Sequence, residues 1–514
     1  MTRNPIIRAF FGPNEISVSL FAGGGGWGIG EHGATGRSPD VAVNHSRAAI
    51  AMHRANHPTT KHYIEDVYKV DPREAAAGRH VALLQLSPDC THHSKAKGGK
   101  PREQKIRGLA WAAIPWVKHC RPRVIILENV TEWLGWGPLC RTTGHPIAAR
   151  KGQTFRAFVR KLESYGYVVE WRILRACDYG APTRRKRLFL IARCDGRPTA
   201  WPTPTHGPLA EPYKTAADCI DWSIPCPSIF ARDKALVPKT EARIARGAWK
   251  FVMTAARPFL VSVNHGGVGR RDHRIHDIDA PAPTITGGQR GGHARVVPYL
   301  VHRSNGERVG QAPRIYDAQQ PLGTLVGTQK HAVCAAFLAK HYSDRPGGGW
   351  PGGAAIDRPI DTVTQRDHHG LVAAFLARYG TSTGQRADVP LSTIDTHDRF
   401  ALIAAELAIP ELTEAMKPRA REVAALLRRH GYKVPGEFAT VTIEGVEIVI
   451  YDLGMRMLGA PELFRANGFP ADYKIDVECD GKTLTKTQQI RLCGNAVPPA
   501  WATALVGANF ARAA

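Results

Sequence analysis

The sequence predicts an α/β protein built on a doubly wound, mostly parallel sheet, with a second region of different construction. Two observations support this organisation. Over residues 1–195, short apolar runs alternate with segments of helical periodicity, which is the pattern of strands joined by crossover helices. From residue 196 onward the chain becomes rich in Gly, Pro, His and Arg. We therefore expect one doubly wound domain, followed by a region of different construction.

The strands and helices of the first region follow from its apolar runs. Six of these runs are predicted to be strands: ISVSLFAG, DVAVN, VALLQLS, RVIILENV, VVEWRIL and RLFLIA. Between them, three segments have helical character: SRAAIAMHRAN, RGLAWAAIPWVKHC and FRAFVRKLESYG. Parallel strands end along one edge of their sheet, where ligands bind. Reactive side chains that follow these strands are therefore expected to meet.

The second region, residues 196–439, contains about four imperfect repeats between 257 and 403, spaced about 38 to 40 residues apart. Each opens with an aromatic-Leu pair, at Phe259-Leu260, Tyr299-Leu300, Phe337-Leu338 and Phe375-Leu376. Each continues through Asp, Pro and Thr to a histidine, at His293, His331, His368 and His397. The repeats are either a duplicated structural unit or a repeated surface that faces a repeated ligand, such as a nucleic-acid backbone.

Residues 440–514 regain strand and helix character in ATVTIEGVEIVIYDLG and PELFRANGF, so we expect them to return to the first domain. A chain of 514 residues, with 43% hydrophobic and 22% charged residues, is long enough for at least two globular domains. Lys and Arg number 69 against 45 Asp and Glu, which gives a net charge of +24. A large polyanion such as nucleic acid is the partner that this charge favours.

The ten cysteines form no CxxC pair, and the first residues lack the apolar core of a signal peptide. No segment approaches the roughly 20 apolar residues of a membrane-spanning helix. We therefore expect reduced thiols, a cytoplasmic location and no membrane association.

Two motifs lie at the ends of predicted strands. In ISVSLFAGGGGWGIG, an apolar strand runs into a glycine-rich turn at Phe21 to Gly26, where missing side chains let backbone N–H groups approach a ligand. A plain tight turn would have the same sequence. In LQLSPDCTHHS, Pro88 and Asp89 end a strand just before Cys90. A lone cysteine is more often a small buried hydrophobic residue, but a thiol at this edge is placed for chemistry.

Further reactive groups follow the later strands. Glu128, in Glu128-Asn129-Val130, ends the next strand and is expected at the same edge as Cys90, unless it is a solvated helix cap. In APTRRKRLFLIA, Arg185 and Arg187 alternate with Arg184 and Lys186, so that two basic groups point to each side of the strand. Near the C-terminus, RLCGNAVPPAWATALV places a Gly-Asn pair before a helix that begins with prolines.

Taken in this order, the glycine turn, the cysteine, Glu-Asn-Val, the paired arginines and Gly-Asn-x-Val make the chain resemble the DNA (cytosine-5) methyltransferase family of bacterial or bacteriophage type. The resemblance covers roughly residues 16–195 and 440–510. The segment DLGMRMLGAPELFRANGFPADY adds Arg456, Glu462 and Gly468-Phe469-Pro470 in matching places. Residues 196–439 occupy the position of the family's variable target-recognition domain.

The resemblance implies an S-adenosylmethionine-dependent, Rossmann-like methyltransferase that transfers a methyl group to carbon 5 of cytosine in a specific DNA sequence. Cys90 would add covalently to carbon 6 of the base, Glu128 would contact ring N3 and the exocyclic amine, and Arg185 and Arg187 would hold the base. The cofactor would be bound by Phe21, Ala22, Gly23, Gly24, Gly25, Asn44, Asp66, Asn495 and Val497. No metal is expected.

The substrate implied is double-stranded DNA, from which the target cytosine is flipped into the pocket. We expect a monomer, and a cognate restriction endonuclease is a partner compatible with a role in restriction-modification. The chain departs from the family pattern with Ser19 in place of Asp, Asn44 in place of an acidic residue, Asp89 in place of Pro, and Thr91 and Thr183 in place of Gln. Two alternatives stay open: an RNA cytosine-5 methyltransferase of the same fold, and a catalytically impaired DNA-binding homologue.

Overall fold

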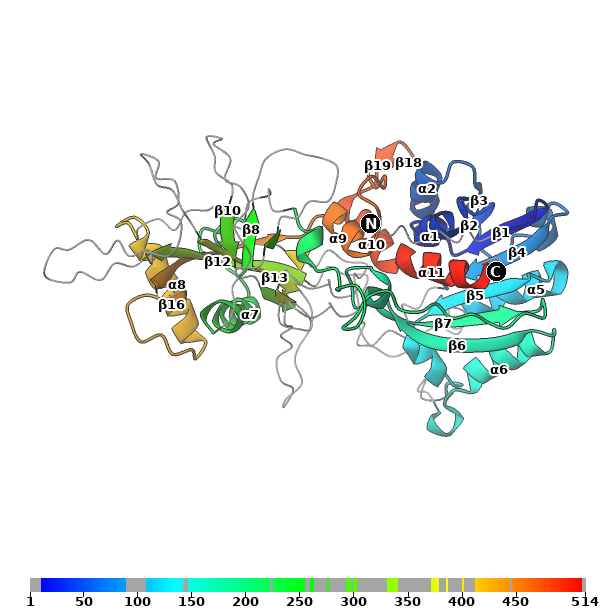
Figure 1. The fold of residues 1–514 in the computed structure, drawn as a ribbon, viewed down its shortest axis with the longest axis horizontal. Coiled ribbons are helices and arrows are strands. Elements are labelled where there is room, and N and C mark those ends of the chain that lie inside the picture. The colour runs from blue at the N-terminus through cyan, green and yellow to red at the C-terminus, as the bar shows by residue number, and fades with distance from the viewer. Residues whose placement is uncertain are drawn as a thin grey trace, which may run out of the picture.

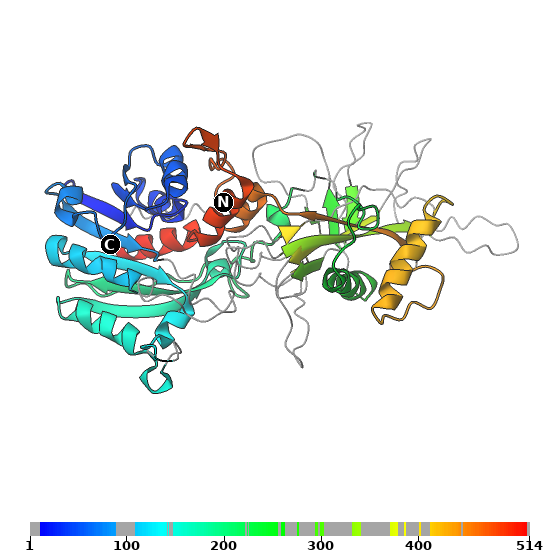
Figure 2. The same cartoon turned by 180° about the vertical axis from the view of Figure 1, so that it is seen from behind.

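The chain forms two lobes, each with its own sheet, as Figures 1 and 2 show from opposite sides. The structure, a computed structural model, describes residues 11–88, 108–140, 142, 147–221, 224, 226–254, 412–443 and 446–510, and the short strands between 259 and 401. Of the predicted sites, Cys90 and its neighbour Asp89 lie outside these residues. None of the helices in the described part is long and apolar enough to cross a membrane.

The first lobe is built on a seven-stranded sheet in the order β3-β2-β1-β4-β5-β7-β6. Its strands are β1 (Glu15–Leu20), β2 (Val41–Val43), β3 (Lys61–Tyr63), β4 (His80–Leu86), β5 (Val124–Asn129), β6 (Val168–Arg175) and β7 (Lys186–Arg193). The first five are parallel, and β7 pairs antiparallel with both β5 and β6. The predicted α/β class with a doubly wound, mostly parallel sheet is confirmed. All six predicted strands are present, and the short β3 is an addition.

Helices cover both faces of this sheet. The lobe contains α1 (Gly26–Thr35), α2 (Arg47–Asn56), α3 (Pro72–Ala76), α5 (Ala113–Cys120), α6 (Gln153–Glu163) and α11 (Pro499–Phe510), with 3₁₀ turns η2 (Leu109–Ala112), η3 (Thr131–Gly135), η4 (Ala148–Arg150) and η5 (Ala176–Tyr179). One face packs against α1 and α11, whose Trp27 and Trp501 contact Phe189 of β7. The other face packs against α3, α5 and α6, with Trp116 and Phe158 fully buried.

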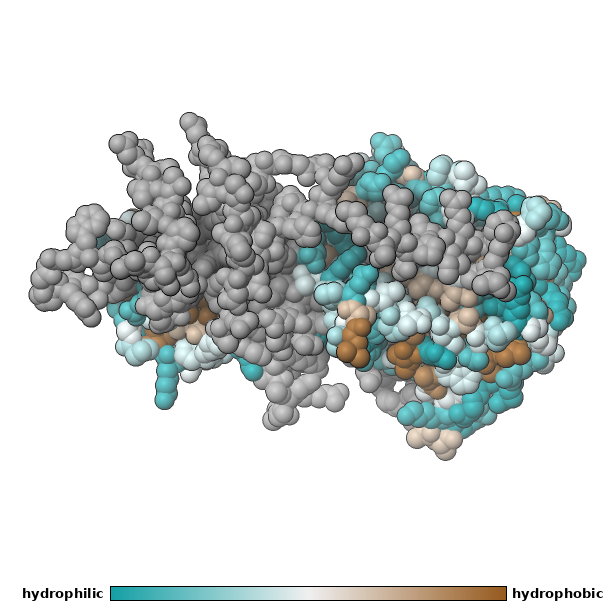
Figure 3. Space-filling model, viewed as in Figure 1, coloured by the Kyte–Doolittle hydropathy of each residue, from teal (hydrophilic) through white to brown (hydrophobic). Residues whose placement is uncertain are grey.

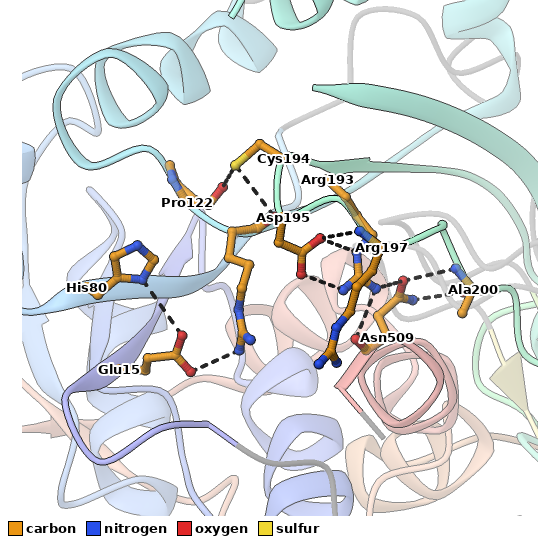
Figure 4. Close-up of polar contacts among 10 residues, drawn as sticks. Glu15, His80, Pro122, Arg193, Cys194, Asp195, Arg197, Ala200 and Asn509 are labelled. Carbon is orange, nitrogen blue, oxygen red and sulfur yellow. Dashed lines mark hydrogen bonds and ion pairs between the residues drawn. The ribbon is translucent and has the colours of Figure 1, made fainter. Parts of the chain in front are cut away.

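The C-terminal helix α11 belongs to this lobe although more than 300 residues separate it from β7. A Cβ atom on Gly30 of α1 would lie 2.3 Å from the Cβ of Ala502, so only glycine lets the two helices pack this closely. At the far end of α11, Arg193 of β7 donates to Asn509 and pairs with Asp195 at 2.7 Å (Figure 4). The first and last parts of the chain therefore form one folded unit.

The second lobe is built on an antiparallel-rich sheet. Its strands are β8 (Phe259–Ser262), β9 (Ile275–His276), β10 (His293–Val296), β11 (Tyr299–His302), β12 (His331–Lys340), β13 (Leu371–Arg378), β14 (Gln385–Arg386), β15 (Phe400–Ala401), β16 (Thr440–Ile443) and β17 (Val446–Met457). Helices α7 (Pro238–Ala248) and α8 (Lys417–Arg429), with a π-helical turn at Trp249–Met253, complete it. The four aromatic-Leu pairs of the repeats each lie in a strand, which fits a duplicated structural unit.

The long strand β17 pairs with β12 along its length and with β16 on its other side, so both β16 and β17 lie in the second sheet. The division of the chain into 1–195, 196–439 and 440–514 stays a prediction, but this pairing leads us to propose a return to the first lobe near residue 458. The return passes through α9 (Ala460–Ala466), the hairpin β18 (Glu478–Cys479) and β19 (Lys482–Thr483), and α10 (Lys486–Asn495). The 3₁₀ turn η6 (Ala217–Cys219) packs beside α9.

A buried ion pair joins the two lobes. Arg456, at the end of β17, makes two hydrogen bonds to Glu462 of α9, at 2.8 and 2.9 Å. It also donates to the backbone carbonyl of Asp221, and Glu462 accepts from the Asp221 N–H. The side chain of Glu462 is 2% exposed. The ion pair therefore fixes both points at which the chain passes between the lobes.

On the face of the first lobe that Figure 3 shows, the described residues are mostly hydrophilic, with small separate apolar spots. The edge strand β6 carries three of its exposed apolar side chains, Val168, Trp171 and Ile173. Charged Glu170 and Arg172 alternate with them, which is a common defence of an exposed sheet edge against pairing with another chain.

Candidate active site

A carboxylate and two guanidinium groups meet at the carboxyl edge of the first sheet. Glu128, near the end of β5, is 5% exposed, and its Oε1 lies 3.0 Å from Nε of Arg187 and 3.9 Å from an Nη atom of Arg185. Both arginines are also buried, whereas Lys186 between them is exposed. The predicted alternation is therefore present, and the buried members of it face Glu128. Glu128 is not a solvated helix cap.

The register of the sheet explains this convergence. Glu128 pairs with Phe189 across β5 and β7, and Arg187 lies two residues before Phe189 on the same face of β7. Arg185 precedes the strand, and its Nη1 donates to the Gly494 carbonyl at 2.8 Å. Thr183, at the position of the family's Gln, is buried and accepts from the Arg185 N–H. The C-terminal Gly-Asn segment is thereby joined to the arginine pair.

The strand that leads to the predicted nucleophile ends next to Glu128. Leu86, the last residue of β4, pairs with Leu127 of β5, so Glu128 lies one residue beyond the level at which β4 ends. Ser87 and Pro88 follow, and the described chain stops there. β4 and β5 run parallel and end at the same edge of the sheet, which is the edge at which the sequence predicts Glu128. Cys90 stays a predicted nucleophile.

The glycine-rich turn connects β1 to α1 at the same edge. Phe21, Gly23 and Gly25 all have positive φ, of 59°, 55° and 82°. For a phenylalanine this conformation is strained, and such strain is concentrated at ligand-binding turns. A Cβ on Gly26 would lie 2.0 Å from the Val497 carbonyl oxygen, so the turn also packs directly against the C-terminal segment.

Two side chains that the sequence did not indicate, Tyr473 and His57, contact this turn. The Tyr473 hydroxyl donates to the Gly24 carbonyl, and burial raises the pKa of Tyr473. The imidazole Nε2 of His57 would lie 2.7 Å from a Cβ on Gly28, and its Nδ1 lies 2.9 Å from Ser38 Oγ. Burial lowers the pKa of His57 to about 4, so this ring is neutral near pH 7.

The other predicted cofactor residues lie along or near this edge. Asn44 directly follows β2, and its Oδ1 accepts from the Ser46 N–H at 2.9 Å. Asp66 is exposed, three residues beyond β3, and accepts from the Tyr68 N–H. Asn495 is the last residue of α10 and is exposed.

The remaining predicted positions in the glycine turn and the C-terminal segment are buried or in contact with each other. Ala22 donates its N–H to the Val43 carbonyl, next to Asn44, and Val497 is 2% exposed. The structure therefore brings together the turn, Asn44 and Val497. It places Asp66 and Asn495 at the exposed rim. Among the described residues, no group of His, Cys, Asp and Glu has an arrangement that could hold a metal ion.

Helix α1 carries a buried carboxyl group that the sequence did not indicate. Glu31 is fully buried, and it accepts hydrogen bonds from Ser17 Oγ of β1 and, at 2.6 Å, from Gln85 Nε2 of β4. Burial raises its pKa from 4.5 to about 8, against the opposing effect of the Ser17 hydrogen bond. Glu31 therefore holds a proton over much of the neutral range.

Comparison with known proteins gives one family. Residues 16–216 match the model of the C-5 cytosine-specific DNA methylase family. Two relatives are the Type II methyltransferases M.AquIA of Picosynechococcus, 28% identical over 42% of this chain and 92% of its own length, and M.AgeI of Thalassovita gelatinovora, 27% identical over 45% of this chain. The chain spans 57% of the length of M.AgeI.

Among solved structures, a putative DNA modification methyltransferase encoded within an E. coli prophage covers 96% of this chain and 97% of its own, at 14% identity and a TM-score of 0.41. The family assignment rests on the sequence matches, which include β1, the glycine-rich turn, β5 with Glu128 and the arginine pair. The methyl donor of this family is S-adenosylmethionine. Residues 16–216 of this chain are therefore similar to the C-5 cytosine-specific DNA methylases.

Proposed function

We propose that this chain transfers a methyl group from S-adenosylmethionine to carbon 5 of cytosine in a specific double-stranded DNA sequence, through a covalent bond between Cys90 and the base. One observation carries the proposal: Glu128, Arg185 and Arg187 are buried together, beside the end of the strand that leads to Cys90. A buried carboxylate with two guanidinium groups can contact both a ring nitrogen and a developing negative charge.

In the proposed reaction, the Cys90 thiolate forms a bond to carbon 6, and the electrons of the 5,6 double bond move toward carbon 5 and ring N3. Glu128 passes to N3 a proton that it takes up from solvent, and it accepts a hydrogen bond from the exocyclic amine, while Arg185 and Arg187 orient Glu128 and the base. Bound S-adenosylmethionine would supply an electrophilic methyl group to carbon 5, and its methyl–sulfur bond would break to leave a neutral thioether. A base such as water then takes the carbon 5 proton, which restores the 5,6 double bond and releases the Cys90 thiolate, and the N3 proton returns to Glu128.

The glycine-rich turn fits this cofactor. The positive φ angles at Phe21, Gly23 and Gly25 expose backbone at the strand edge, as a ligand that approaches the main chain closely requires. The Asn44 side-chain nitrogen makes no hydrogen bond to any described residue, so it can donate to a ribose hydroxyl. We therefore propose the turn, Asn44 and Asp66 for the nucleoside side, and Val497 and Asn495 for the rim.

The first test replaces the nucleophile. Cys90→Ser should bind DNA and cofactor but transfer no methyl group, since a hydroxyl is a far poorer nucleophile than a thiolate near neutral pH. Methyl incorporation into DNA and into RNA, and cofactor binding, are measured on the same preparations. Substantial DNA methylation by the variant would disprove the role of Cys90. Methylation of RNA in place of DNA by the wild-type protein would disprove the substrate.

We propose that the second lobe contacts DNA and selects the site. Three observations support this proposal: the chain is strongly basic, the second lobe lies between the two parts of the first lobe in the sequence, and the repeats supply strands of one sheet. Replacing residues 257–403 by a short linker should abolish site-selective methylation and flatten the salt dependence of DNA binding, because fewer counterions are released.

Two point variants of the repeats give a finer test. Of the repeat histidines, His293 and His331 begin strands β10 and β12, whereas His368 and His397 lie outside the described residues. His331→Ala and His368→Ala are assayed by bisulfite sequencing of host DNA. An unchanged site and salt slope in both would leave the repeats as scaffold.

A further inference from the structure

The indole of Trp27 is tied to the end of strand β4. Trp27 is the second residue of α1, directly after the glycine-rich turn, and it is 2% exposed. Its Nε1 donates a hydrogen bond of 2.6 Å to Ser87 Oγ. A buried indole N–H needs a partner, and here the partner is the first residue after β4.

This hydrogen bond is the short contact that holds the strand end. The backbone N–H of Ser87 lies 3.4 Å from the Leu20 carbonyl, which is long for a strand hydrogen bond. The Trp27 ring also lies edge-on to Phe189 at 6.3 Å, and Phe189 is the partner of Glu128 in the sheet. One side chain therefore contacts the end of the strand before Cys90 and the neighbour of Glu128.

We propose that Trp27 is a positioning residue, which fixes the point where the segment carrying Cys90 leaves the sheet; the proposal rests on the function proposed above. Cys90 is three residues beyond Ser87 in the sequence, a length of chain that spans at most ~11 Å. A displacement of Ser87 is therefore passed on to Cys90 with little chain to absorb it. Misplacement of a reacting group by about 1 Å can cost 10²-fold in rate.

Another tryptophan on the same face provides a matched control. Trp501 of α11 is fully buried and lies edge-on to the same Phe189 ring, at 5.0 Å. Unlike Trp27, its indole nitrogen has no hydrogen-bond partner among the described residues. Trp27→Phe and Trp501→Phe remove the same atoms from the same core, but only the first removes a hydrogen bond.

The experiment compares Trp27→Phe, Ser87→Ala, the double variant and Trp501→Phe in steady-state methylation of DNA. We expect kcat to fall about tenfold in each of the first two, equivalent to ~1.4 kcal/mol in the barrier, with KM for S-adenosylmethionine and for DNA within about twofold of wild type. The double variant should be no slower than either single one, because both remove one interaction. Trp501→Phe should keep the wild-type kcat.

Hydrogen exchange provides a second reading that does not depend on activity. Peptides that cover residues 84–90 should exchange faster in Trp27→Phe and Ser87→Ala than in Trp501→Phe, while peptides of β6 and β7 stay unchanged. Unchanged exchange at 84–90, additive losses of kcat, or an equal loss in Trp501→Phe would each overturn the proposal. If the wild-type protein methylates no DNA, the proposed function fails, and exchange at 84–90 still decides whether Trp27 holds the strand end.

Discussion

Replacing Glu31 by Gln should remove a pH dependence of stability that the buried carboxyl group imposes. Its pKa is raised to about 8 in the folded state, against 4.5 when exposed, so the folded protein holds a proton that the unfolded chain releases. The stability that this proton contributes is fully present below pH 4.5, and it is lost as the pH rises to about 8. A difference of about 3.5 between the two pKa values corresponds to ~5 kcal/mol in total, of which ~3 kcal/mol is lost by pH 7.

The neighbours of Glu31 can accommodate the amide. Gln85 donates its Nε2 to Glu31, and its own Oε1 has no hydrogen-bond partner among the described residues. Rotation of the Gln85 amide by half a turn would let Oε1 accept from a glutamine at position 31, while Ser17 continues to donate to the other side. Glu31→Gln should therefore match wild type near pH 5 and exceed it by several kcal/mol at pH 8.

The assay is denaturant unfolding of both proteins at pH 5, 6, 7 and 8, followed by tryptophan fluorescence. The difference between the two proteins is used, because other titrating groups cancel in it. Glu31→Ala is the control: it should lose the same slope with pH, but lie lower throughout because it leaves a cavity and an unsatisfied Gln85. A difference between Glu31→Gln and wild type that stays constant from pH 5 to 8 would refute the reasoning.

Three further predictions follow from the first lobe. Glu128→Gln should lower the methylation rate at least 100-fold, since an amide cannot hand a proton to the base. It should also lower the thermal midpoint, because the buried guanidinium groups lose their anion. Wild-type turnover by this variant would contradict the prediction. Gly26→Ala should lower the free energy of unfolding, measured with denaturant, by about 1–3 kcal/mol, since its Cβ would meet the Val497 carbonyl. Gly507→Ala is the control: it has open space around it and should not destabilise the protein. His57→Gln should reduce the loss of stability on acidification. The neutral ring contributes stability above pH 6.5 that is lost as the pH falls toward 4, about 3 kcal/mol at most. Equal dependence of the unfolding free energy on acid pH in both proteins would contradict this.

The sequence predicted the convergence at the sheet edge because it depends on simple rules. Parallel strands end at one edge, so Glu128 could be placed there without coordinates. Alternation along the strand put Arg185 and Arg187 on one side. That this side faces Glu128 depends on the antiparallel pairing of β7 with β5, which the sequence alone did not indicate. Cys90 follows from the same rules, but stays a prediction. The residues that shape the glycine turn escaped prediction, because Tyr473 reaches Gly24 from 449 positions away.

Helix α1 shows a second limit of the sequence. Its four glycines have low helix propensity, and only the turn before it was predicted. The helix forms because Gly26 and Gly30 allow close packing against the C-terminal segment, a contact that no local pattern reveals. The same holds for strand β17, whose sequence indicates a strand but not that its partner is β12. Glu31 was missed because a single acidic residue in a helix ordinarily faces solvent.

The contact between α1 and α11 bears on how the protein folds during its own synthesis. At 5–20 residues per second, a ribosome needs roughly 15–60 s to travel the roughly 300 residues from β7 to α11. During that interval, the face of the nascent sheet that Trp501 and its neighbours finally cover has no helix α11 above it. Completion of the first lobe is therefore a late event, and we expect the emerging chain to depend on chaperones until α11 leaves the ribosome.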